Sequence, residues 1–215
     1  MAEMTPERWR WTNDYAREVF GDPDDQLTTL MDRATAAGLP SIAVSPDVGR
    51  LLQILASATR GRLALELGTL GGYSGIWIAR GLAPAGRLIT VELDDRHADF
   101  AEGEFAAAGL SDRVEVRRGA ALEVLPALAE ELGPESLDFV FIDAVKVEYT
   151  DYFEAVKPLM APGAILAADN VYGTGAGWID EGYGTDEFNR MVASDPDFLT
   201  TATPMREGVL IARRL

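Results

Sequence analysis

The segment LALELGTLGGYSG, residues Leu63 to Gly75, decides the fold. A short β-like run, Leu63–Leu67, leads directly into three closely spaced glycines, and a helical pattern begins at Tyr73. Glycines at a strand-to-helix turn let the backbone approach a ligand closely. The segment therefore predicts a strand, a binding loop and a crossover helix.

From Leu63 onward, β-like runs alternate with helical segments, which is typical of a parallel sheet with crossover helices. The expected strands are Leu63–Leu67, Arg87–Glu92, Val114–Arg118, Leu137–Ile142, Ala164–Ala168, Phe198–Thr203 and Gly208–Arg213. The expected helices between and after them are Tyr73–Leu82, Asp95–Ala108, Ala121–Leu132, Glu148–Lys157 and Thr185–Ala193. We therefore expect an α/β fold with a doubly wound, mostly parallel seven-stranded sheet, whose ligand lies at the carboxyl ends of the strands.

Three helical patterns precede the first strand. Two of them carry start signals in which a capping residue precedes proline, Asp22-Pro23 and Ser45-Pro46. No internal repeat or Pro/Ser-rich linker divides the chain. We expect one domain over residues 1–215, with residues 1–60 as a helical cap segment and residues 61–215 as the α/β core.

Composition excludes several classes of partner and site. The net charge of −16 disfavours nucleic-acid binding. No apolar stretch is long enough to cross a bilayer and no secretory signal is visible, so we expect no membrane partner and a cytoplasmic location. With no cysteine and a single histidine, His97, any metal site must use oxygen ligands, which select hard cations such as Mg²⁺, Mn²⁺ or Ca²⁺.

The glycine loop favours a cationic ligand over NAD or ATP. Glu66 lies two residues before Gly68, where a carboxylate would repel a pyrophosphate but suits an ammonium group. The loop lacks both the G-x-G-x-x-G spacing and the lysine of a phosphate-binding loop. Ser74 does not complete a G-x-S-x-G hydrolase motif, and we expect it to be a donor at the start of the helix.

The next two strand ends fit a nucleoside. Glu92 follows Gly68 at the end of the second strand, where a carboxylate can accept both ribose hydroxyls; the alternative is a solvated glutamate. The small residues Gly119, Ala120 and Ala121 would let backbone amides meet an adenine edge, although the same run also makes an ordinary tight turn. With the acidic glycine loop, these features predict a site for S-adenosylmethionine (SAM).

Oxygen-bearing side chains end the fourth and fifth strands. Asp143 follows FVFI, and Asp169 with Asn170 follows ILAA, so all three emerge at one edge of a parallel sheet. Two carboxylates and an amide oxygen could hold Mg²⁺ there. The alternative is that Asp143 caps a helix and that Asp169-Asn170 forms an Asx turn. Lys146 follows Asp143 closely enough to lean over this edge; the alternative is a solvated surface lysine.

Five segments, in order, resemble the class I SAM-dependent methyltransferases, specifically the metal-dependent catechol and caffeoyl-CoA O-methyltransferase group. They are IAVSPDVGRLL, LELGTLGGYS, ITVELDD, FVFIDAVKVEY and ILAADNV, and the likeness runs from about Trp9 to the C-terminus. The resemblance implies a Rossmann-like methyltransferase fold and O-methylation of a catechol-like or phenolic small molecule with SAM and a divalent metal ion.

The resemblance also assigns roles to residues. It implies metal ligation by Asp143, Asp169 and Asn170, and makes Lys146 the general base in contact with the substrate. The residues that it implies for SAM binding are Val44, Glu66, Gly68, Thr69, Gly72, Ser74, Glu92, Ala121 and Asp143. Val145 stands where the family often has an aspartate, which changes the charge around Lys146.

The segment VYGTGAGWIDEGYG breaks the strand–helix alternation and supplies aromatic residues. Tyr172, Trp178 and Tyr183 are candidates for stacking on an aromatic substrate; the alternative is a connecting loop with packed aromatics. His97 falls on the polar face of its helix, so we expect it to be solvated. Homodimers are common in the resembled family, and Trp9 and Trp11 could supply an apolar contact.

Three rival functions remain open at this point. A metal-independent small-molecule methyltransferase would keep the cofactor loop and use Asp143 and Asp169 structurally. A nicotinamide-dependent dehydrogenase could share a similar sheet, although Glu66 and the missing third fingerprint glycine argue against it. A non-catalytic protein could bind SAM without turnover.

Overall fold

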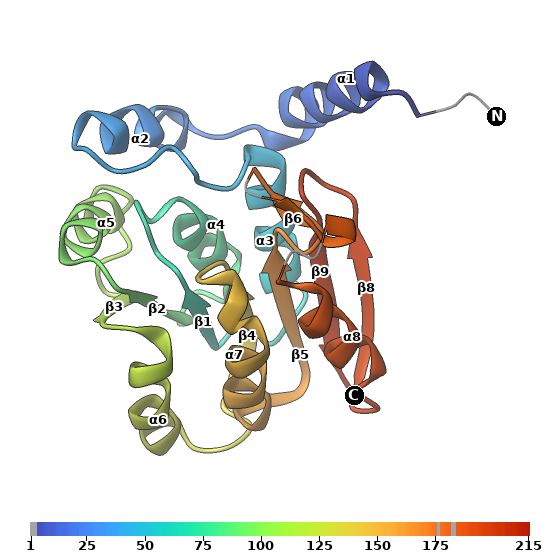
Figure 1. The fold of residues 1–215 in the computed structure, drawn as a ribbon. Helices are drawn as coiled ribbons and strands as arrows, with labels where there is room; N and C mark the ends of the chain where they lie inside the picture. Colours follow the sequence, from blue (N-terminus) through green and yellow to red (C-terminus); the bar gives the residue numbers. More distant parts are fainter. Residues whose placement is uncertain (1–3, 176, 182–183) are drawn as a thin grey trace.

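The computed structural model describes residues 4–175, 177–181 and 184–215, and this part of the chain contains a seven-stranded sheet (Figure 1). The strand order is β3-β2-β1-β4-β5-β9-β8. The bounds are β1 (Leu63–Leu67), β2 (Arg87–Glu92), β3 (Val114–Arg118), β4 (Leu137–Ile142), β5 (Met160–Asp169), β8 (Phe198–Thr203) and β9 (Val209–Arg214). The first five strands pair in parallel, while β9 runs antiparallel to both β5 and β8. The expected mostly parallel, doubly wound sheet is confirmed.

Helices cover both faces of this sheet (Figure 1). Their bounds are α1 (Pro6–Ala16), α2 (Asp25–Ala36), α3 (Pro46–Ser57), α4 (Tyr73–Gly81), α5 (Asp95–Ala107), α6 (Ala121–Leu132), α7 (Tyr149–Val156) and α8 (Asp186–Ser194). Shorter elements are η1 (Arg17–Gly21), η2 (Lys146–Glu148), η3 (Lys157–Leu159), η4 (Ile179–Glu181) and the hairpin of β6 (Gly173–Thr174) and β7 (Gly177–Trp178).

Strand alternation divides the core into two layers. On β4 all six residues are buried: Phe139 and Phe141 belong to one apolar cluster, and Val140 and Ile142 to the other. Successive side chains of a strand point to opposite faces, so a strand that is covered on both sides is apolar throughout. Helices α2 to α5 contribute to the first cluster and α6 to α8 to the second. This double cover leaves the carboxyl ends of the strands as the place for polar side chains.

The start of α2 differs from the prediction. Asp22 does not cap this helix: its backbone is left-handed, with φ 43°, at the end of η1. Asp24 is the cap instead, and its carboxylate accepts a hydrogen bond from the amide of Leu27. Pro46 does occupy the first turn of α3 as expected, but the hydroxyl of Ser45 makes no capping hydrogen bond.

The helices that precede β1 differ in how they pack against the core. α3 packs into the core through Val48, Leu52 and Ala56. α1, in contrast, has no buried residue and extends away from the sheet (Figure 1). Within the described ranges, no helix has the length and apolar character needed to cross a membrane.

Candidate functional site

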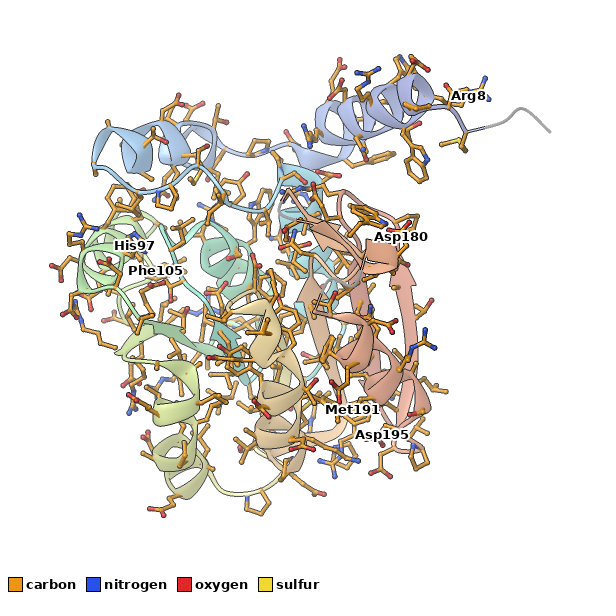
Figure 2. All side chains as sticks on the ribbon, viewed as in Figure 1. Arg8, His97, Phe105, Asp180, Met191 and Asp195 are labelled. Carbon is orange, nitrogen blue, oxygen red and sulfur yellow. The ribbon has the colours of Figure 1, made fainter. Side chains whose placement is uncertain are left out.

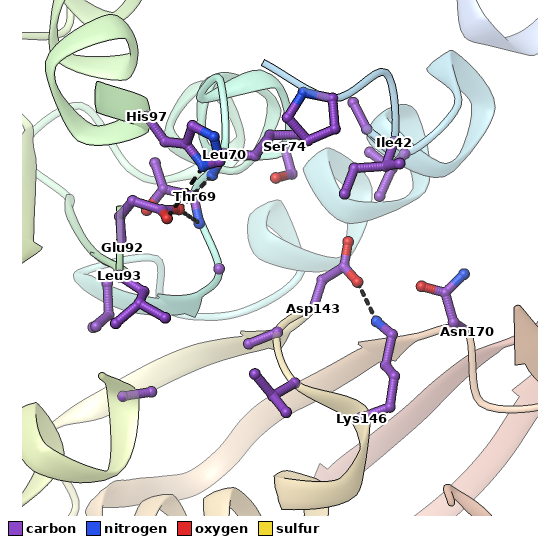
Figure 3. Close-up of a pocket in the computed structure, with 18 of the residues that line it drawn as sticks. Ile42, Thr69, Leu70, Ser74, Glu92, Leu93, His97, Asp143, Lys146 and Asn170 are labelled. Carbon is purple, nitrogen blue, oxygen red and sulfur yellow. Dashed lines mark hydrogen bonds and ion pairs between the residues drawn. The ribbon is translucent and has the colours of Figure 1, made fainter. Parts of the chain in front are cut away.

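A cavity of about 590 Å³ lies at the carboxyl ends of β1, β2 and β4 (Figure 3). β1 is hydrogen-bonded to β2 on one side and to β4 on the other, so the chain order reverses at this point. Ligands of open α/β sheets bind where the order reverses. We call this space the strand-end cavity. Its walls are the loop after β1, the ends of β2 and β4, segment 40–44 and the turn between β8 and β9.

The glycine loop forms the wall above β1. Gly68 has φ 96°, and a Cβ atom there would lie 2.2 Å from the carbonyl oxygen of Asp143. Only glycine fits that approach. Gly72 has φ 81°, caps α4 and packs against Phe105, so it shapes the loop without lining the cavity.

Glu92 holds this loop by its backbone. One carboxylate oxygen accepts hydrogen bonds from the amides of Thr69 (3.1 Å) and Leu70 (2.7 Å), and the other accepts one from the amide of Asp94 (2.9 Å). The Glu92 side chain is buried at 9% exposure, yet it lines the cavity. A carboxylate that accepts several backbone hydrogen bonds is fixed in place.

The prediction that His97 is solvated is wrong. Its ring is 17% exposed, lies 3.5 Å from a carboxylate oxygen of Glu92 and lines the cavity (Figure 3). The helical period placed it on a polar face, but the turn between β2 and α5 brings that face against the end of β2. His97 is thus a wall residue that the sequence did not reveal.

Glu66 lies beneath the glycine loop and does not line the cavity. It is fully buried, and its two carboxylate oxygens accept hydrogen bonds from the hydroxyls of Ser74 and Thr90, each at 2.6 Å. Burial raises the pKa of Glu66 from 4.5 to about 7. The two hydrogen bonds lower this pKa, but by less than burial raises it, and the charges of Asp143 and Glu92 make a smaller contribution that also raises it. Because Glu66 does not line the cavity, it does not make the direct contact with an ammonium group that the sequence predicts. Ser74 does line the cavity.

This burial predicts a pH-dependent stability for the ligand-free protein. Because the folded-state pKa is raised, the ionised carboxylate destabilises the folded state increasingly as pH rises from 4.5 to about 7. Glu66→Gln should therefore unfold like the wild type below pH 4.5 and become more stable above it, by up to about 3 kcal/mol at pH 8. Urea unfolding of both proteins from pH 4 to 8 measures this difference; a difference that does not grow with pH would contradict the buried-carboxylate account.

Lys146 is held by two neighbours from its own segment. Its ammonium group donates hydrogen bonds to Asp143 Oδ1 (2.5 Å) and to the hydroxyl of Tyr149 (2.7 Å). Tyr149 is completely buried, and its single O–H lies within hydrogen-bonding distance of the carbonyl oxygens of Ile142 (3.2 Å) and Asp169 (3.1 Å). The side chain of Lys146 is 17% exposed and lines the cavity, so it is not a solvated surface lysine.

Asp169 and Asn170 end β5 beside Asp143, as expected. Asp169 is 1% exposed, and its Oδ1 atom is buried with no hydrogen-bond partner among the described residues. Burial and the nearby charge of Asp143 raise the pKa of Asp169 to about 7. Asn170, with φ 58°, lines the cavity, and Figure 3 shows Asp143, Lys146 and Asn170 pointing into the same region.

Few side chains at the ends of β4 and β5 could ligate a metal ion. Within the described residues, no three His, Cys, Asp or Glu side chains gather closely enough to hold a metal ion. The arrangement at this edge offers two carboxylates and one amide oxygen.

The expected aromatic stacking residues lie elsewhere. Tyr172 packs its ring against Gly208, and Trp178 packs against Gly173 across the β6–β7 hairpin with 40% of its surface exposed. Neither of them lines the strand-end cavity. Tyr183 lies outside the described residues. The arrangement thus gives Tyr172 and Trp178 packing roles, which was the alternative reading of this loop.

The remaining predicted residues and several unexpected ones line the cavity. Val44, Thr69, Ala121 and Asp143 do so as expected. Wall residues that the sequence did not single out for this site include Tyr152 and Glu148, whose side chains are hydrogen-bonded to each other, and Arg206.

Comparisons with known proteins identify the family of this chain. The O-methyltransferase family model matches residues 18–215. The chain belongs to the O-methyltransferase family. A catechol O-methyltransferase from Niastella koreensis is 45% identical over 157 residues, which cover 73% of this chain and 71% of that protein. A catechol O-methyltransferase from Mycobacterium tuberculosis is 45% identical over 153 residues, covering 71% and 67% respectively.

Solved structures extend the likeness over nearly the whole O-methyltransferase. An O-methyltransferase from Bacillus cereus in complex with SAH superposes with a TM-score of 0.84 at 36% identity and covers 97% of this chain and 99% of its own. TomG from Streptomyces achromogenes, in complex with SAM and involved in tomaymycin synthesis, gives a TM-score of 0.84 at 34% identity with 99% coverage of both chains. The protein is therefore a SAM-dependent O-methyltransferase with the Rossmann-like methyltransferase fold. This assignment decides against the nicotinamide-dependent dehydrogenase and the non-catalytic binding protein.

Proposed function

We propose that this O-methyltransferase transfers the methyl group of SAM to a hydroxyl of a catechol-like, phenolic small molecule, with Mg²⁺ or another divalent cation such as Mn²⁺ or Ca²⁺ bound at the ends of β4 and β5. The observation that carries the proposal is the buried Oδ1 atom of Asp169, which has no hydrogen-bond partner among the described residues and belongs to an edge that also holds a second carboxylate and an amide. Two relatives at 45% identity are named catechol O-methyltransferases, which supports the same acceptor class.

The residues at this edge fit a hard cation. A buried carboxylate oxygen without a hydrogen bond costs free energy, and a cation bound to it would remove that cost. Carboxylate and amide oxygens are the ligands that Mg²⁺ prefers, with water or substrate oxygens completing the shell. Asp143, Asp169 and Asn170 would therefore hold the ion. Bound there, a divalent ion would lower the pKa of a coordinated hydroxyl and orient the acceptor.

The other end of the cavity fits SAM. We propose that Glu92 accepts the ribose hydroxyls, that Ala121 borders the adenine and that Ser74, Gly68, Thr69 and Val44 surround the amino-acid end. The carboxylate of Glu92 is fixed by three backbone amides, so it presents a preorganised acceptor. Glu66 would act from below, through the hydroxyl of Ser74.

Lys146 is the proposed general base. Its nitrogen lies at the cavity wall between the proposed cofactor and acceptor ends, and Tyr149 fixes its direction from behind. As a cation it donates to Asp143, so it must lose a proton before it can accept one from the acceptor hydroxyl. A divalent charge on Asp143 would weaken the attraction that holds that proton. The phenolate oxygen would then take the methyl group of SAM as the bond from carbon to sulfur breaks, leaving neutral S-adenosylhomocysteine and the proton on Lys146.

Methylation of catechol tests the proposal. We expect turnover with SAM and Mg²⁺, loss of turnover in excess EDTA, and recovery when Mg²⁺ is restored. Turnover that survives EDTA would contradict the role of the ion and favour the metal-independent methyltransferase. Absence of turnover on catechols of every size tried, with SAM bound, would contradict the acceptor class.

We also propose that two copies associate through the aromatic face of α1. Trp11 and Tyr15, four residues apart on one face of α1, are 65% and 45% exposed and stack with ring centroids 5.3 Å apart, and Phe20 of η1 continues this row. Trp9, 38% exposed, is two residues from Trp11 and therefore lies on another face of the helix. A helix with no buried residue and a row of exposed rings is typical of an interface. Light scattering should give twice the chain mass of 23.2 kDa, and Trp11→Glu should give the single mass. A wild-type mass of one chain at working concentration would contradict this association.

A further inference from the structure

Arg206 is a half-buried cation at the proposed acceptor end of the strand-end cavity. It lies in the turn between β8 and β9 and lines the cavity with Lys146 and Asn170. Its side chain is only 19% exposed, and Nη1 lies 3.8 Å from Asp169 Oδ2. The register of the sheet causes this proximity, because Asp169 pairs with Val209 directly after the turn. A second positive charge thus lies beside the proposed metal ligands.

The guanidinium group has few hydrogen bonds for its burial. Within the described part of the chain, the one hydrogen bond it makes is from Nη1 to the carbonyl oxygen of Ala43, at 3.4 Å. Glu207 lies 3.2 Å from Nε, but the Glu207 Oε2 atom has no hydrogen bond, so this contact is an ion pair without aligned donor geometry. An arginine carries five N–H donors in a planar fork. Among the described residues, most of these donors have no hydrogen-bond acceptor, and Arg206 is a residue of the cavity wall.

The backbone at Arg206 is also unfavourable for its side chain. Its φ of 49° lies in the left-handed region, which glycine adopts more readily. Such a conformation persists where the surrounding structure holds it, and it is enriched at functional sites. A bulky cation is therefore kept at a turn position where its backbone conformation alone would favour a glycine.

The charges around Arg206 limit the ligand. Asp143 and Asp169 face the proposed cation, which would offset their charges. Glu207 is the nearest counter-charge to Arg206, Glu148 adds a further carboxylate to the cavity wall, and Lys146 is neutral when it acts as the base. A single guanidinium cation with carboxylates around it suits a singly charged anion better than a phosphate ester. A planar carboxylate also matches the fork geometry of a guanidinium group.

We infer that Arg206 makes a carboxylate subsite, so that the preferred acceptor is a catechol whose ring carries a carboxylate group. This inference rests on the proposed function, because it names the acceptor subclass of the same site. Arg206 is within reach of Asp169, so the carboxylate would be attached to the ring or very near it. The alternative roles for Arg206 are positioning of Asp169 and binding of the carboxylate of SAM.

The test compares two acceptors of the same shape, 3,4-dihydroxybenzoate and 3,4-dihydroxybenzamide. We expect the wild type to favour the acid in kcat/KM. Arg206→Gln should lower the ratio of kcat/KM for the acid to that for the amide by about 10-fold to 100-fold, mainly through KM. Because the same two rings are compared in each variant, differences in hydroxyl acidity cancel. Arg190→Gln, which removes an exposed arginine of α8 paired with Asp186, is the matched control and should leave the ratio unchanged.

Binding provides a second readout. Calorimetry on the enzyme saturated with SAH should show a weaker Kd for 3,4-dihydroxybenzoate in Arg206→Gln and the same Kd for SAH itself. Equal losses for acid and amide would assign Arg206 a positioning role, and a weaker Kd for SAH would assign it to the cofactor; either result overturns the inference. Arg206→Gly relieves the backbone strain and keeps the test valid if Arg206→Gln does not fold.

Failure of the carboxylate subsite can be told apart from failure of the proposed function. If the wild type methylates catechol but favours the amide or treats both acceptors alike, the carboxylate subsite is wrong and the proposed function stands. If the wild type methylates none of the three compounds, the proposed function fails and the carboxylate subsite fails with it.

Discussion

Lys146→Met is expected to lower kcat for methyl transfer to catechol by about 10²-fold to 10⁴-fold, the usual contribution of a general base. Lys146 lines the cavity next to Asp143, and methionine keeps the length of its stem without a nitrogen. Binding of SAM should change little, because Lys146 is not among the residues proposed to hold the cofactor. Single-turnover rates with saturating SAM and Mg²⁺, together with calorimetric binding of SAM, measure both effects.

The chain supplies a matched control for this prediction. Its sequence has one other lysine, Lys157, which pairs with Asp195 (2.6 Å) and Asp197 (2.9 Å). Asp195 lies at the opposite end of the molecule from His97 of the cavity wall (Figure 2). Lys157→Met removes the same charge and should keep the wild-type rate. A Lys146→Met protein that keeps more than about a tenth of the wild-type rate would contradict the role of the base.

Asp169→Asn is expected to abolish Mg²⁺-dependent turnover without lowering the stability of the ligand-free protein. Because burial and the charge of Asp143 raise the pKa of Asp169 from 3.8 to about 7, this carboxyl group destabilises the folded state increasingly as pH rises from 3.8 to about 7, and an amide removes this cost. Saturating Mg²⁺ should raise the melting temperature of the wild type, since a ligand at 100 times its Kd stabilises by about 2.7 kcal/mol. The same Mg²⁺ should leave Asp169→Asn unchanged.

Asp138→Asn is the matched control for the metal prediction. Asp138 is also a buried carboxylate, and it lies near the opposite end of β4. It pairs with Arg60 and Arg62. Burial alone would raise the pKa of Asp138, but these two arginines hold it below its usual range. Its amide variant should therefore lose stability at pH 7 and keep the Mg²⁺ response. If Asp169→Asn responds to Mg²⁺ as the wild type does, the metal site is not at Asp169.

The strand ends were predictable because pattern and chemistry change at the same residue. The apolar runs of β2, β4 and β5 stop where Glu92, Asp143 and Asp169 begin, so one observation fixed both the end of each strand and the position of its polar group. Parallel pairing then brings these ends to one edge. This is why the sheet and most of the cavity wall follow from the sequence.

The cavity residues that the sequence did not reveal depend on contacts between distant segments. His97 and Arg206 reach the cavity through a turn after β2 and through the pairing of β5 with β9, which periodicity does not reveal. The sequence pattern indicates that Tyr149 is a core residue. Its role in orienting Lys146 is visible only from the hydrogen bond that Lys146 donates to its hydroxyl. Tyr172 and Trp178 lie outside the cavity wall because a glycine-rich loop can pack its aromatic rings on neighbouring glycines as well as on a ligand.

A crystal structure of the protein with S-adenosylhomocysteine, catechol and Mg²⁺ tests the central claim most directly. We expect one ion bound by oxygens of Asp143, Asp169 and Asn170 at about 2.1 Å, with both catechol oxygens on the same ion and Lys146 beside one of them. Catechol and the nucleoside bound in the cavity with no ion on these three residues would contradict it.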